Sequence, residues 1–377
     1  MYIIGAGRTK FGKLEKSLEE LAYEAISKAI YDSELSIHDI DAIYVANFLG
    51  GPLNGQLHLN AMISSLIPGC HLPIIRVETA CASSSSALNQ AIIALNKFSN
   101  ILVVGVEKLT GSFLIPPIDA IAMAEDKAID KENGLIFPAA YALIAQRYFR
   151  EYGVTHETLE KISFLNHNNA NLNPLAHFYQ KKVTMDMIRD SKMVSAPLNL
   201  FDCSPLSDGA VAMIISNEKQ SDRNVKILSS QIASDTISIV ERKDITSFKA
   251  TKIAARRAYE ESNLKPTEIG IFEVHDCFTI GELIALEDLG LCDKGNGKHL
   301  VENDLISING EYPVNTDGGL KAHGHPIGAT GLAQIYEIVT QIRGDAGKRQ
   351  LPDIESGLAQ NIGGIGGTSG ITILGCL

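Results

Sequence analysis

Positive charge, long apolar stretches and patterned cysteines are all scarce in this 377-residue chain. Its 33 lysines and arginines are outnumbered by 44 aspartates and glutamates, which leaves a formal net charge of -11. A surface of that sign repels nucleic acid and anionic lipid and leaves room only for a local basic groove. No run approaches the roughly 18 apolar residues of a membrane helix, and no cleavable leader opens the chain. These absences predict a soluble, cytoplasmic protein that binds neither nucleic acid nor membrane.

The 6 cysteines are irregularly spaced, which excludes a secreted disulfide framework and predicts reduced thiols. Metal-ligating side chains do occur near one another in the sequence, at His275, Cys277, Cys292 and His299. Because no paired C-x-x-C knuckle joins them, we predict no metal site.

A weak internal repeat organises the chain. SLEELAYEAISKAIYDSEL opens with a capping box, Ser17 and Glu20, continues with apolar residues at helical spacing, and leads to the predicted strand DAIYVANF. The second half repeats this order in ITSFKATKIAARRAYEESNL and IGIFEVHDCF. Sliding Ser33 onto Ser262 aligns three later pairs, Ile40 with Ile269, Val45 with Val274 and Phe48 with Cys277.

Each half then continues as strand, loop, helix and strand. The first half has PIIRVET, the cysteine loop, a helix and ILVVGVE, and the second has EYPVN, KAHGHPIGATG, a helix, ESGLAQNI and SGITILG. This alternation predicts an α/β protein with parallel-rich sheets covered by helices and with pseudo-two-fold symmetry.

Residues 113–205 interrupt the alternation and are richer in asparagine, proline, histidine and charge. They predict an inserted, mostly helical loop domain. DGAVAMIISN at 208–217 then indicates a buried strand that completes the first sheet. We therefore predict an N-terminal half at 1–112 plus 206–220, the insertion at 113–205, and a C-terminal half at 221–377.

Residues 78–92, ETACASSSSALNQAI, place Cys81 before four serines. A free cysteine is most often a buried, unreactive thiol. Here, however, a strand should end near Glu78 and a helix should begin within a few residues of Cys81. The helix macrodipole and unpaired amides favour a thiolate, and the amides can also hold an oxyanion. The small serines would let the helix end lie against another element, and the apolar stripe after them argues against a flexible linker.

GHPIGATG at 324–331 places His325 between a glycine and a proline at the mouth of a helix. Pro326 fixes the backbone and Gly324 leaves space, so the imidazole suits a general base or an oxyanion donor. The alternative is a loop histidine in solvent, which is what we expect of His323.

HDCF at 275–278 follows a predicted strand. Functional groups of α/β sheets gather at strand ends, and on a continuing strand His275 and Cys277 would face the same side. The alternative is that both only pack or meet solvent.

NIGGIGG at 361–367 is a glycine-dense turn between two predicted strands. Turn chemistry favours a plain hairpin, whereas glycine would also let a backbone N–H approach a ligand. A phosphate loop is excluded because no Lys-Ser/Thr follows and no helix begins there.

Four ordered motifs, TACASSSSAL, HDCF, NTDGGLKAHGHPIGATG and NIGGIGG, resemble those of the thiolases, closest to the sterol-carrier-protein-type and archaeal branch. The likeness covers nearly the whole chain, including NHNNANLNP, PLNLFDCSPLSDGA and FPAAYALIAQRY. It implies a thiolase fold in five layers, αβαβα, with coenzyme A as a co-substrate and an acyl group carried on a cysteine.

The resemblance also implies roles for single residues. Cys81 matches the nucleophile, and His325 matches the histidine that activates it. Cys277 matches the acid/base cysteine of this branch, and His275 matches a companion oxyanion donor. Gly363 would offer its backbone N–H, together with that of Cys81, to the acyl-enzyme oxyanion.

One departure concerns the second cysteine. Most thiolases carry it in a C-terminal C-x-G motif, where this chain has Asn361, Ile362 and Gly363. The proton-transfer role must then move to Cys277, which chemistry permits if that thiol reaches the substrate α-carbon. Cys376 lies outside such a motif and is expected to be structural.

The motifs favour a thiolase that transfers an acyl group between 3-ketoacyl-CoA and CoA. A decarboxylating condensing enzyme like the ketoacyl synthases would use the same Cys-His-His set, and a non-catalytic acyl-CoA-binding subunit is a third hypothesis. Family resemblance suggests a homodimer or a dimer of dimers, and archaeal relatives suggest a complex with a hydroxymethylglutaryl-CoA synthase. The acyl chain and the direction of the reaction are not determined by any motif.

Overall fold

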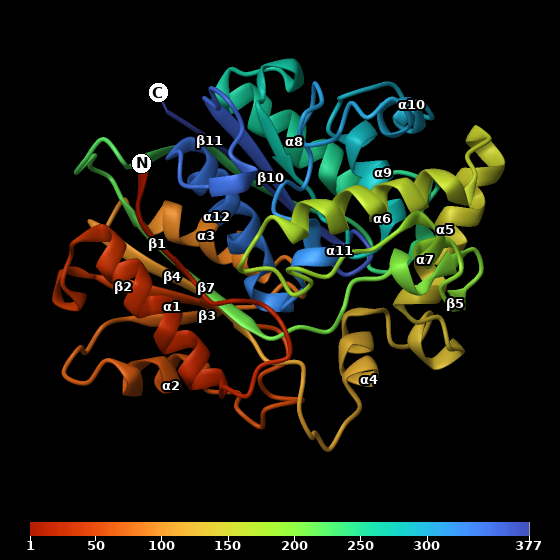
Figure 1. Ribbon diagram of the computed structural model, residues 1–377. Coiled ribbons are helices and arrows are strands. Elements are labelled where there is room, and N and C mark those ends of the chain that lie inside the picture. The colour runs from red at the N-terminus through yellow and green to blue at the C-terminus, as the bar shows by residue number, and fades with distance from the viewer. Residues whose placement is uncertain (377) are drawn as a thin grey trace.

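A mixed sheet runs through the computed structural model, which describes residues 1–376 (Figure 1). Its strands lie in the order β3-β2-β4-β7-β1-β8-β11-β10-β9. Pairing is parallel between β2 and its neighbours and between β9 and β10, as expected for strands joined through helices. The bounds are β1 Tyr2–Arg8, β2 Ala42–Ala46, β3 Ile74–Val77, β4 Asn100–Glu107, β7 Gly209–Ser216, β8 Val225–Ser234, β9 Ile271–Glu273, β10 Ser356–Gly363 and β11 Thr368–Gly375.

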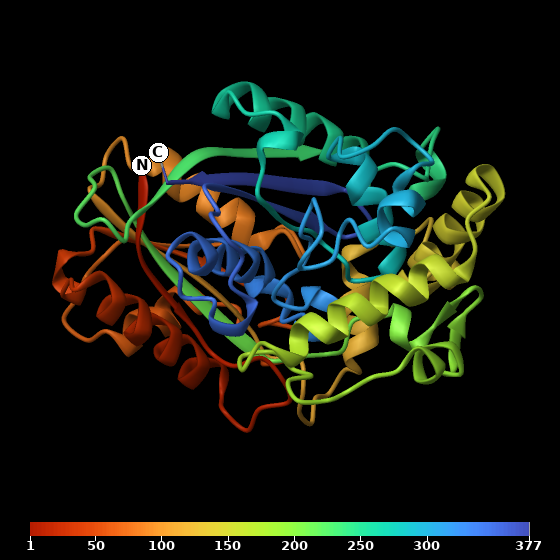
Figure 2. The same ribbon diagram turned by 45° about the horizontal axis from the view of Figure 1, so that its top comes forward.

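The sheet has two halves, because strands β1 and β8 pair at only two positions, Tyr2 with Lys226 and Ile3 with Val225. The halves splay apart, with helices between them and on both outer faces (Figure 2). These layers confirm the predicted αβαβα thiolase fold. The inner helices are α3 (Ser83–Ala94) and α12 (Thr330–Ile342), and the outer ones are α1 (Leu18–Ser33) and α2 (Leu59–Leu66) on one side and α8 (Lys249–Ser262) and α9 (Thr279–Asp288) on the other.

The predicted repeat is confirmed at the level of single residues. The capping box of Ser17 and Glu20 starts α1. That helix ends at Ser33 with Glu34 in the left-handed conformation, and α8 ends at Ser262 with Asn263 in the same conformation. A three-residue 3-10 helix follows in each half, and then β2 or β9 begins at the matching position.

The predicted strand EYPVN does not form. Val314 makes only an isolated bridge to Phe272 in β9, whereas β3, its counterpart, pairs along β2. The reason is local: Pro313 has no N–H to donate to β9, so pairing does not extend beyond the bonds that the Pro313 carbonyl and the Asn315 N–H make with Phe272.

Residues 113–205 form the predicted, mostly helical insertion, which packs on α9 and on α11 (Gly319–His323) of the C-terminal half. Its domain limits remain predictions. The insertion contains α4 (Pro117–Ile121), α5 (Phe137–Tyr152), α6 (His156–Asn171), α7 (Met185–Arg189) and the hairpin β5 (Met193–Ser195) and β6 (Leu198–Asn199).

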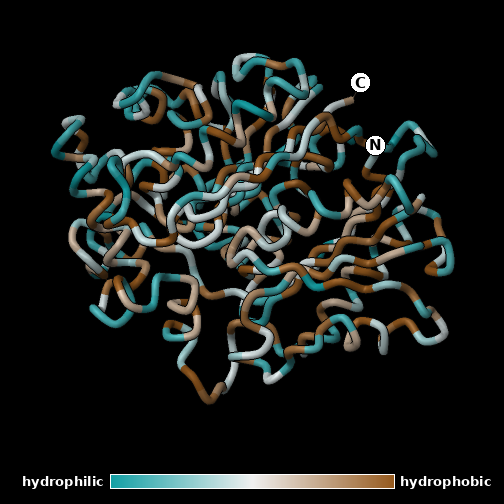
Figure 3. Tube along the Cα trace, turned by 180° about the vertical axis from the view of Figure 1, so that it is seen from behind, coloured by the Kyte–Doolittle hydropathy of each residue, from teal (hydrophilic) through white to brown (hydrophobic). Residues whose placement is uncertain are grey.

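The apolar core follows the pleat of the strands. In β2, Ile43 and Val45 face α1, whereas Ala42 and Tyr44 face the inner helices. Figure 3 shows hydrophobic segments along the strands and hydrophilic ones in the outer loops. Within residues 1–376, no helix is long and apolar enough to cross a membrane.

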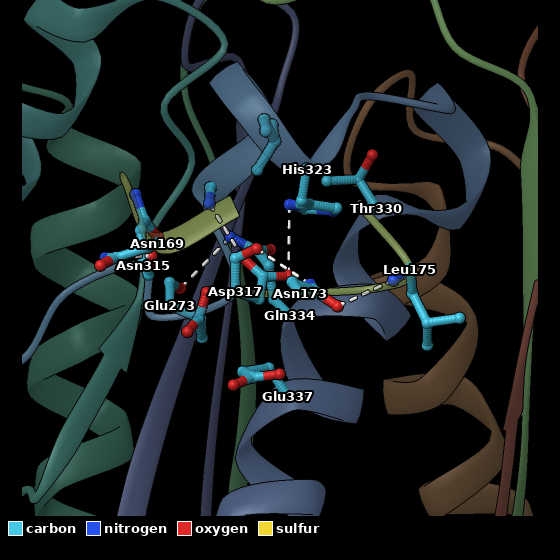
Figure 4. A network of polar contacts seen from close by, with 12 residues as sticks. Asn169, Asn173, Leu175, Glu273, Asn315, Asp317, His323, Thr330, Gln334 and Glu337 are labelled. Carbon is cyan, nitrogen blue, oxygen red and sulfur yellow. Dashed lines mark hydrogen bonds and ion pairs between the residues drawn. The ribbon is translucent and has the colours of Figure 1, made fainter. Parts of the chain in front are cut away.

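A buried polar network lies where the two halves and the insertion meet (Figure 4). His323 Nδ1 lies 3.2 Å from Asp317 Oδ2, and Asn173 Nδ2 of the insertion donates to the Asp317 carbonyl at 2.9 Å. Arg8 of β1 lies 3.6 Å from the same carboxylate. His323, expected in solvent, is instead fully buried, because its Nδ1 lies beside this carboxylate and its ring stacks on that of Phe11.

Candidate active site

Cys81 lies in the turn between β3 and α3. The strand ends at Val77 and the helix begins at Ser83, which confirms the predicted position before a helix N-terminus. The following serines are buried where α3 meets α12, and Ser84 Oγ accepts a hydrogen bond from the Leu332 N–H at 3.1 Å. Small side chains thus let the two inner helices approach, as the sequence predicts.

Two histidines face Cys81 from the C-terminal half. Reactive atoms of Cys81, His275 and His325 all lie within 4.8 Å of one another. The two imidazole rings meet edge to face, with their centroids 5.3 Å apart. Zinc accepts such donors, and a thiol beside two imidazoles is also an arrangement suited to proton transfer.

Hydrogen bonds set the tautomer of His325. Thr330 Oγ1 donates to the Pro326 carbonyl at 3.1 Å, so it accepts the proton of His325 Nδ1 at 2.7 Å. The other ring nitrogen, Nε2, therefore keeps its lone pair. Burial lowers the pKa of His325 to about 3, so the ring is neutral at physiological pH.

Asn361 sets the tautomer of His275. Its Nδ2 lies 3.2 Å from His275 Nδ1, and its Oδ1 shares the Ser85 Oγ–H, at 3.0 Å, with the Ala82 carbonyl, at 2.9 Å. An amide nitrogen only donates, so His275 Nδ1 accepts and the ring proton lies on Nε2. Among the described residues His275 Nε2 has no partner. This N–H is therefore free for a ligand oxygen.

Cys277 lies in the loop between β9 and α9 and lines the same pocket as Cys81, which is described below. The strand ends at Glu273, so the prediction that strand alternation places His275 and Cys277 on one side is wrong. The loop is instead held by a bond from the His275 N–H to Gln360 Oε1 at 2.7 Å and by a bond from the Ser204 N–H to the Cys277 carbonyl at 2.9 Å.

The prediction of a resting thiolate at Cys81 is wrong. The side chain is only 6% exposed. Burial raises its pKa to about 12, and the Gly364 N–H and its own N–H only partly offset that shift. The unfavourable desolvation of the thiolate is larger than the stabilisation that the two amide N–H groups provide.

The glycine turn forms the predicted hairpin between β10 and β11 and also contributes to the site. The amide beside the Cys81 sulfur belongs to Gly364, one residue after the predicted Gly363. Gly364 lines the pocket, whereas a Cβ on Gly363 would lie 2.3 Å from the Thr79 carbonyl. Gly363 is thus needed for close packing, and its oxyanion role stays a prediction.

Two models of protein families match most of this chain. The model described as Thiolase, N-terminal domain matches residues 1–219, and Thiolase C-terminal domain-like matches residues 232–376. Acetyl-CoA acetyltransferase of Methanothermobacter thermautotrophicus is 43% identical, covering 98% of both chains. Sterol carrier protein 2 of Bos taurus is 35% identical, covering 99% of this chain and 72% of that longer protein. The chain belongs to the thiolase family.

A solved structure resembles this thiolase along its whole length. It is described as an Ltp2-ChsH2(DUF35) aldolase and superposes with a TM-score of 0.86 at 26% identity, covering 99% of this chain and 97% of that chain. The fold is therefore shared with a protein whose description names a different reaction.

The reacting groups of the thiolase open into an apolar pocket of about 250 Å³. Cys81, Cys277 and His325 lie at one side of it. Much of its wall comes from the insertion, including Ile118, Ile121, Phe137, Val194 and Leu200. The insertion thus sets the size of this pocket.

Sequence reasoning missed two residues of the thiolase site, Tyr141 and Thr330. Burial raises the pKa of Cys277 well above its ordinary value, and the Tyr141 hydroxyl beside it opposes that shift. The Tyr141 ring stacks on Phe278 with centroids 4.5 Å apart. The stretch FPAAYALIAQRY contains the tyrosine, but nothing local distinguishes it from a core aromatic.

Proposed function

We propose that this thiolase is an acetyl-CoA acetyltransferase that moves an acyl group between 3-ketoacyl-CoA and CoA through acyl-Cys81. The observation that carries the proposal is the cluster of Cys81, His275 and His325 within 4.8 Å, beside a second thiol, Cys277. Relatives of 43% and 42% identity that bear this name support the substrate class. CoA enters as a co-substrate, and the steps below need no resident cofactor.

In the first step His325 is the base for Cys81. Its Nε2 lone pair takes the thiol proton as the sulfur attacks the carbonyl carbon of the acyl group. The pKa values of about 12 for Cys81 and about 3 for His325 mean that the proton moves only with that attack. When the substrate is a thioester, its bond to CoA breaks and His325 returns the proton to the CoA thiolate. Acyl-Cys81 and free CoA result.

In the second step Cys277 moves the proton at the α-carbon. In cleavage the Cys81 sulfur attacks the 3-keto carbon, the bond between the α- and β-carbons breaks, and the Cys277 thiol protonates the departing enolate. The Cys277 thiolate then takes the proton of an incoming CoA, whose sulfur attacks acyl-Cys81. The Cys81 thiolate leaves and takes its proton back from His325. Condensation is the reverse. Because burial raises the Cys277 pKa, the resting thiol is the form that cleavage needs.

Oxyanions need donors in both steps. The free Nε2–H of His275 suits the enolate oxygen, and after proton transfer His325 adds a second donor. The backbone amides of Cys81 and of Gly363 or Gly364 are the candidate donors to the acyl-enzyme oxyanion.

The test is covalent labelling followed by mass spectrometry. We expect acetyl-CoA to add one acetyl group to the wild type and none to Cys81→Ala. Cys277→Ala should still be acylated, yet its turnover of acetoacetyl-CoA should fall by about 10²-fold or more. Cys376→Ala is the matched control, because that thiol is exposed and should change neither result. An adduct that persists in Cys81→Ala refutes the proposal.

Three other activities would give different results in labelling and turnover experiments. A decarboxylating condensing enzyme would require malonyl-CoA and would tolerate loss of Cys277. An aldolase would cleave its substrate without an acyl-enzyme. A non-catalytic acyl-CoA-binding subunit would release no CoA thiol with any 3-ketoacyl-CoA. Cys277 in the pocket beside Cys81 favours the thiolase over all three.

The acyl group is proposed to be short and linear, because the pocket of about 250 Å³ is apolar and lined by side chains of the insertion. A chain-length series of 3-ketoacyl-CoA substrates assayed for CoA-dependent cleavage tests this. Activity should be greatest for acetoacetyl-CoA and fall as the chain grows.

Assembly is also a proposal. Strand β3 lies at one edge of the sheet, and Ile75 on it is 49% exposed. An exposed edge strand invites pairing with a second copy, which supports a homodimer or a dimer of dimers. Sedimentation of the wild type and of Ile75→Lys would test it. A complex with a hydroxymethylglutaryl-CoA synthase and a cytoplasmic location both stay predictions.

A further inference from the structure

A second cavity, of about 440 Å³, lies behind one wall of the Cys81 pocket. The two cavities share Leu200 and the segment 203–205 as lining. We call the second one the lysine pocket and define it by His167, Phe178, Lys181, Lys182, Phe201 and Lys321. None of the steps proposed above uses it.

Lys321 supplies a buried positive charge with little to neutralise it. The side chain is 2% exposed, and its Nζ donates to the Cys203 carbonyl at 3.0 Å. Within residues 1–376 it forms no ion pair with a carboxylate. Burial lowers its pKa to about 8, so the ammonium form still predominates at pH 7.

The nearest carboxylates are already bonded to other groups. Asp202 accepts from His156 Nε2 at 2.7 Å and from Thr279 Oγ1 at 2.7 Å. Asp276 accepts from the Leu320 N–H at 2.6 Å and from Asn166 Nδ2 at 2.8 Å. Both carboxylates attract the Lys321 ammonium through space, but neither lines the lysine pocket, so an anion entering the cavity would meet no carboxylate among its lining residues.

His167 adds an independent sign of an absent ligand. It is 1% exposed, it lines the lysine pocket, and neither of its ring nitrogens has a hydrogen-bond partner among the described residues. A buried polar group without a partner is costly. An N–H of this ring could donate to an oxygen held by Lys321.

The remaining walls are apolar and the mouth is basic. Phe178, Phe201 and Met187 line the cavity, and the exposed Lys181 and Lys182 lie beside them. No aspartate or glutamate lines it, although the chain has a formal net charge of -11. Apolar walls with a concentrated positive charge fit a ligand that has an apolar body and one anionic head.

We propose that the lysine pocket binds an amphipathic carboxylate of fatty-acid type, its head on Lys321 and His167 and its chain along Phe178 and Phe201. Such a ligand lies behind the shared wall, outside the acyl-transfer pocket. That wall is tied to the catalytic loops, because Ser204 bonds to the Cys277 carbonyl and Leu206 bridges to His325. A fatty carboxylate would thus bind beside the reaction without taking the substrate's place.

The experiment titrates decanoate by calorimetry at pH 7 into the full chain carrying Cys81→Ala, in the presence of acetoacetyl-CoA, which this variant does not turn over and which occupies the acyl-transfer pocket. We expect saturable binding of one decanoate, and no measurable binding of acetate or of decylamine, which lack the chain and the negative head respectively. Lys321→Met should weaken binding at least about tenfold, the size expected for loss of a charge-assisted hydrogen bond.

Two further variants keep the proposal falsifiable if Lys321→Met does not fold. Met187→Trp, at a half-exposed position on the cavity wall, should abolish decanoate binding by filling the space. Met123→Trp is the matched control, because that residue is also half exposed and does not line the cavity, and its affinity should stay within about twofold. Equal binding of decylamine, unchanged affinity in Met187→Trp, or loss of decanoate binding when acetoacetyl-CoA is present would overturn the proposal. This experiment measures only the binding of decanoate. A negative result would therefore not contradict the proposed acyl transfer, and loss of the acyl-transfer proposal would not prevent this measurement.

Discussion

At the scale of single residues, burial decides the protonation state of Cys81 and His325. The helix N-terminus beside the thiol favours a thiolate, yet burial raises the thiol pKa to about 12 and lowers the imidazole pKa to about 3. The pair therefore rests as neutral thiol and neutral imidazole. Reactivity depends on a bound carbonyl that makes the proton transfer favourable.

The pH dependence of alkylation tests this state. Iodoacetamide reacts with the thiolate, and a raised thiol pKa means that the thiolate fraction keeps rising with pH up to about 12. We expect the alkylation rate of Cys81 to increase about tenfold per pH unit from 7 to 10, without a plateau near the ordinary thiol pKa of about 8.5. Cys81→Ser serves to subtract labelling of the other thiols. A plateau below pH 8 would instead show a thiolate–imidazolium pair.

Asn361 is a positioning residue for His275. Asn361→Asp keeps the size of the side chain but offers an acceptor to His275 Nδ1, so the ring proton moves there and Nε2 can no longer donate. We expect kcat for acetoacetyl-CoA cleavage to fall about 10²- to 10³-fold, with little change in KM. The loss should shrink as pH falls, because the introduced carboxyl group, once protonated, donates as the amide does.

A merely structural role would give another result. Asn361→Asp would then lower the melting temperature and the activity together, and lowering the pH would not restore turnover. Asn361→Ala, which neither donates nor accepts, should lose activity at every pH.

At the scale of elements, the repeat explains why two helices end alike. Both α1 and α8 finish at a serine and are followed by a residue in the left-handed conformation, Glu34 and Asn263. A side chain disfavours that conformation, and asparagine tolerates it better than glutamate. Glycine would suit both positions.

Glu34→Gly should therefore stabilise the protein by about 1 kcal/mol, since φ is 58° and the side chain is exposed. Asn263→Gly, at the equivalent position with φ of 55°, is the matched control and should gain only a few tenths of a kcal/mol. Urea denaturation of both variants measures the difference. A loss of stability in Glu34→Gly would mean that its side chain makes a contact worth more than the strain.

At the scale of the whole molecule, buried charge links the two halves. Arg8 of the first half lies near Asp317 of the second, and both are almost fully buried. Although burial alone would raise the pKa of Asp317, His323 and Arg8 hold it well below its usual range. The carboxylate is thus charged and depends on both partners.

Arg8→Met should cost about 3–5 kcal/mol in the free energy of unfolding, because Asp317 would lose a buried counter-charge. The double variant Arg8→Met with Asp317→Asn should recover part of that loss, since no unpaired charge then remains. Chemical denaturation of the single and double variants measures the coupling. Additive losses would show that the 3.6 Å contact contributes no coupling.

Sequence by itself determined most of the elements of this thiolase and their order, and it predicted candidate reactive residues. Helical spacing, strand composition and the repeat are local patterns, so α1, α8, β2 and β7 were predictable, as was Cys81 before a helix. The strand EYPVN was overpredicted because Pro313 lacks the N–H that would extend its pairing with β9.

Only the tertiary structure decided what those residues can do. Burial sets the protonation of Cys81 and His325, and contacts between distant segments set the tautomers, through Thr330 for His325 and through Asn361 for His275. Tyr141 reaches Cys277 from the insertion, a contact that no spacing in the chain encodes. The physical reason is the same in each case: solvation and hydrogen bonding depend on which groups the fold brings together, whereas periodicity records only which face of an element is apolar.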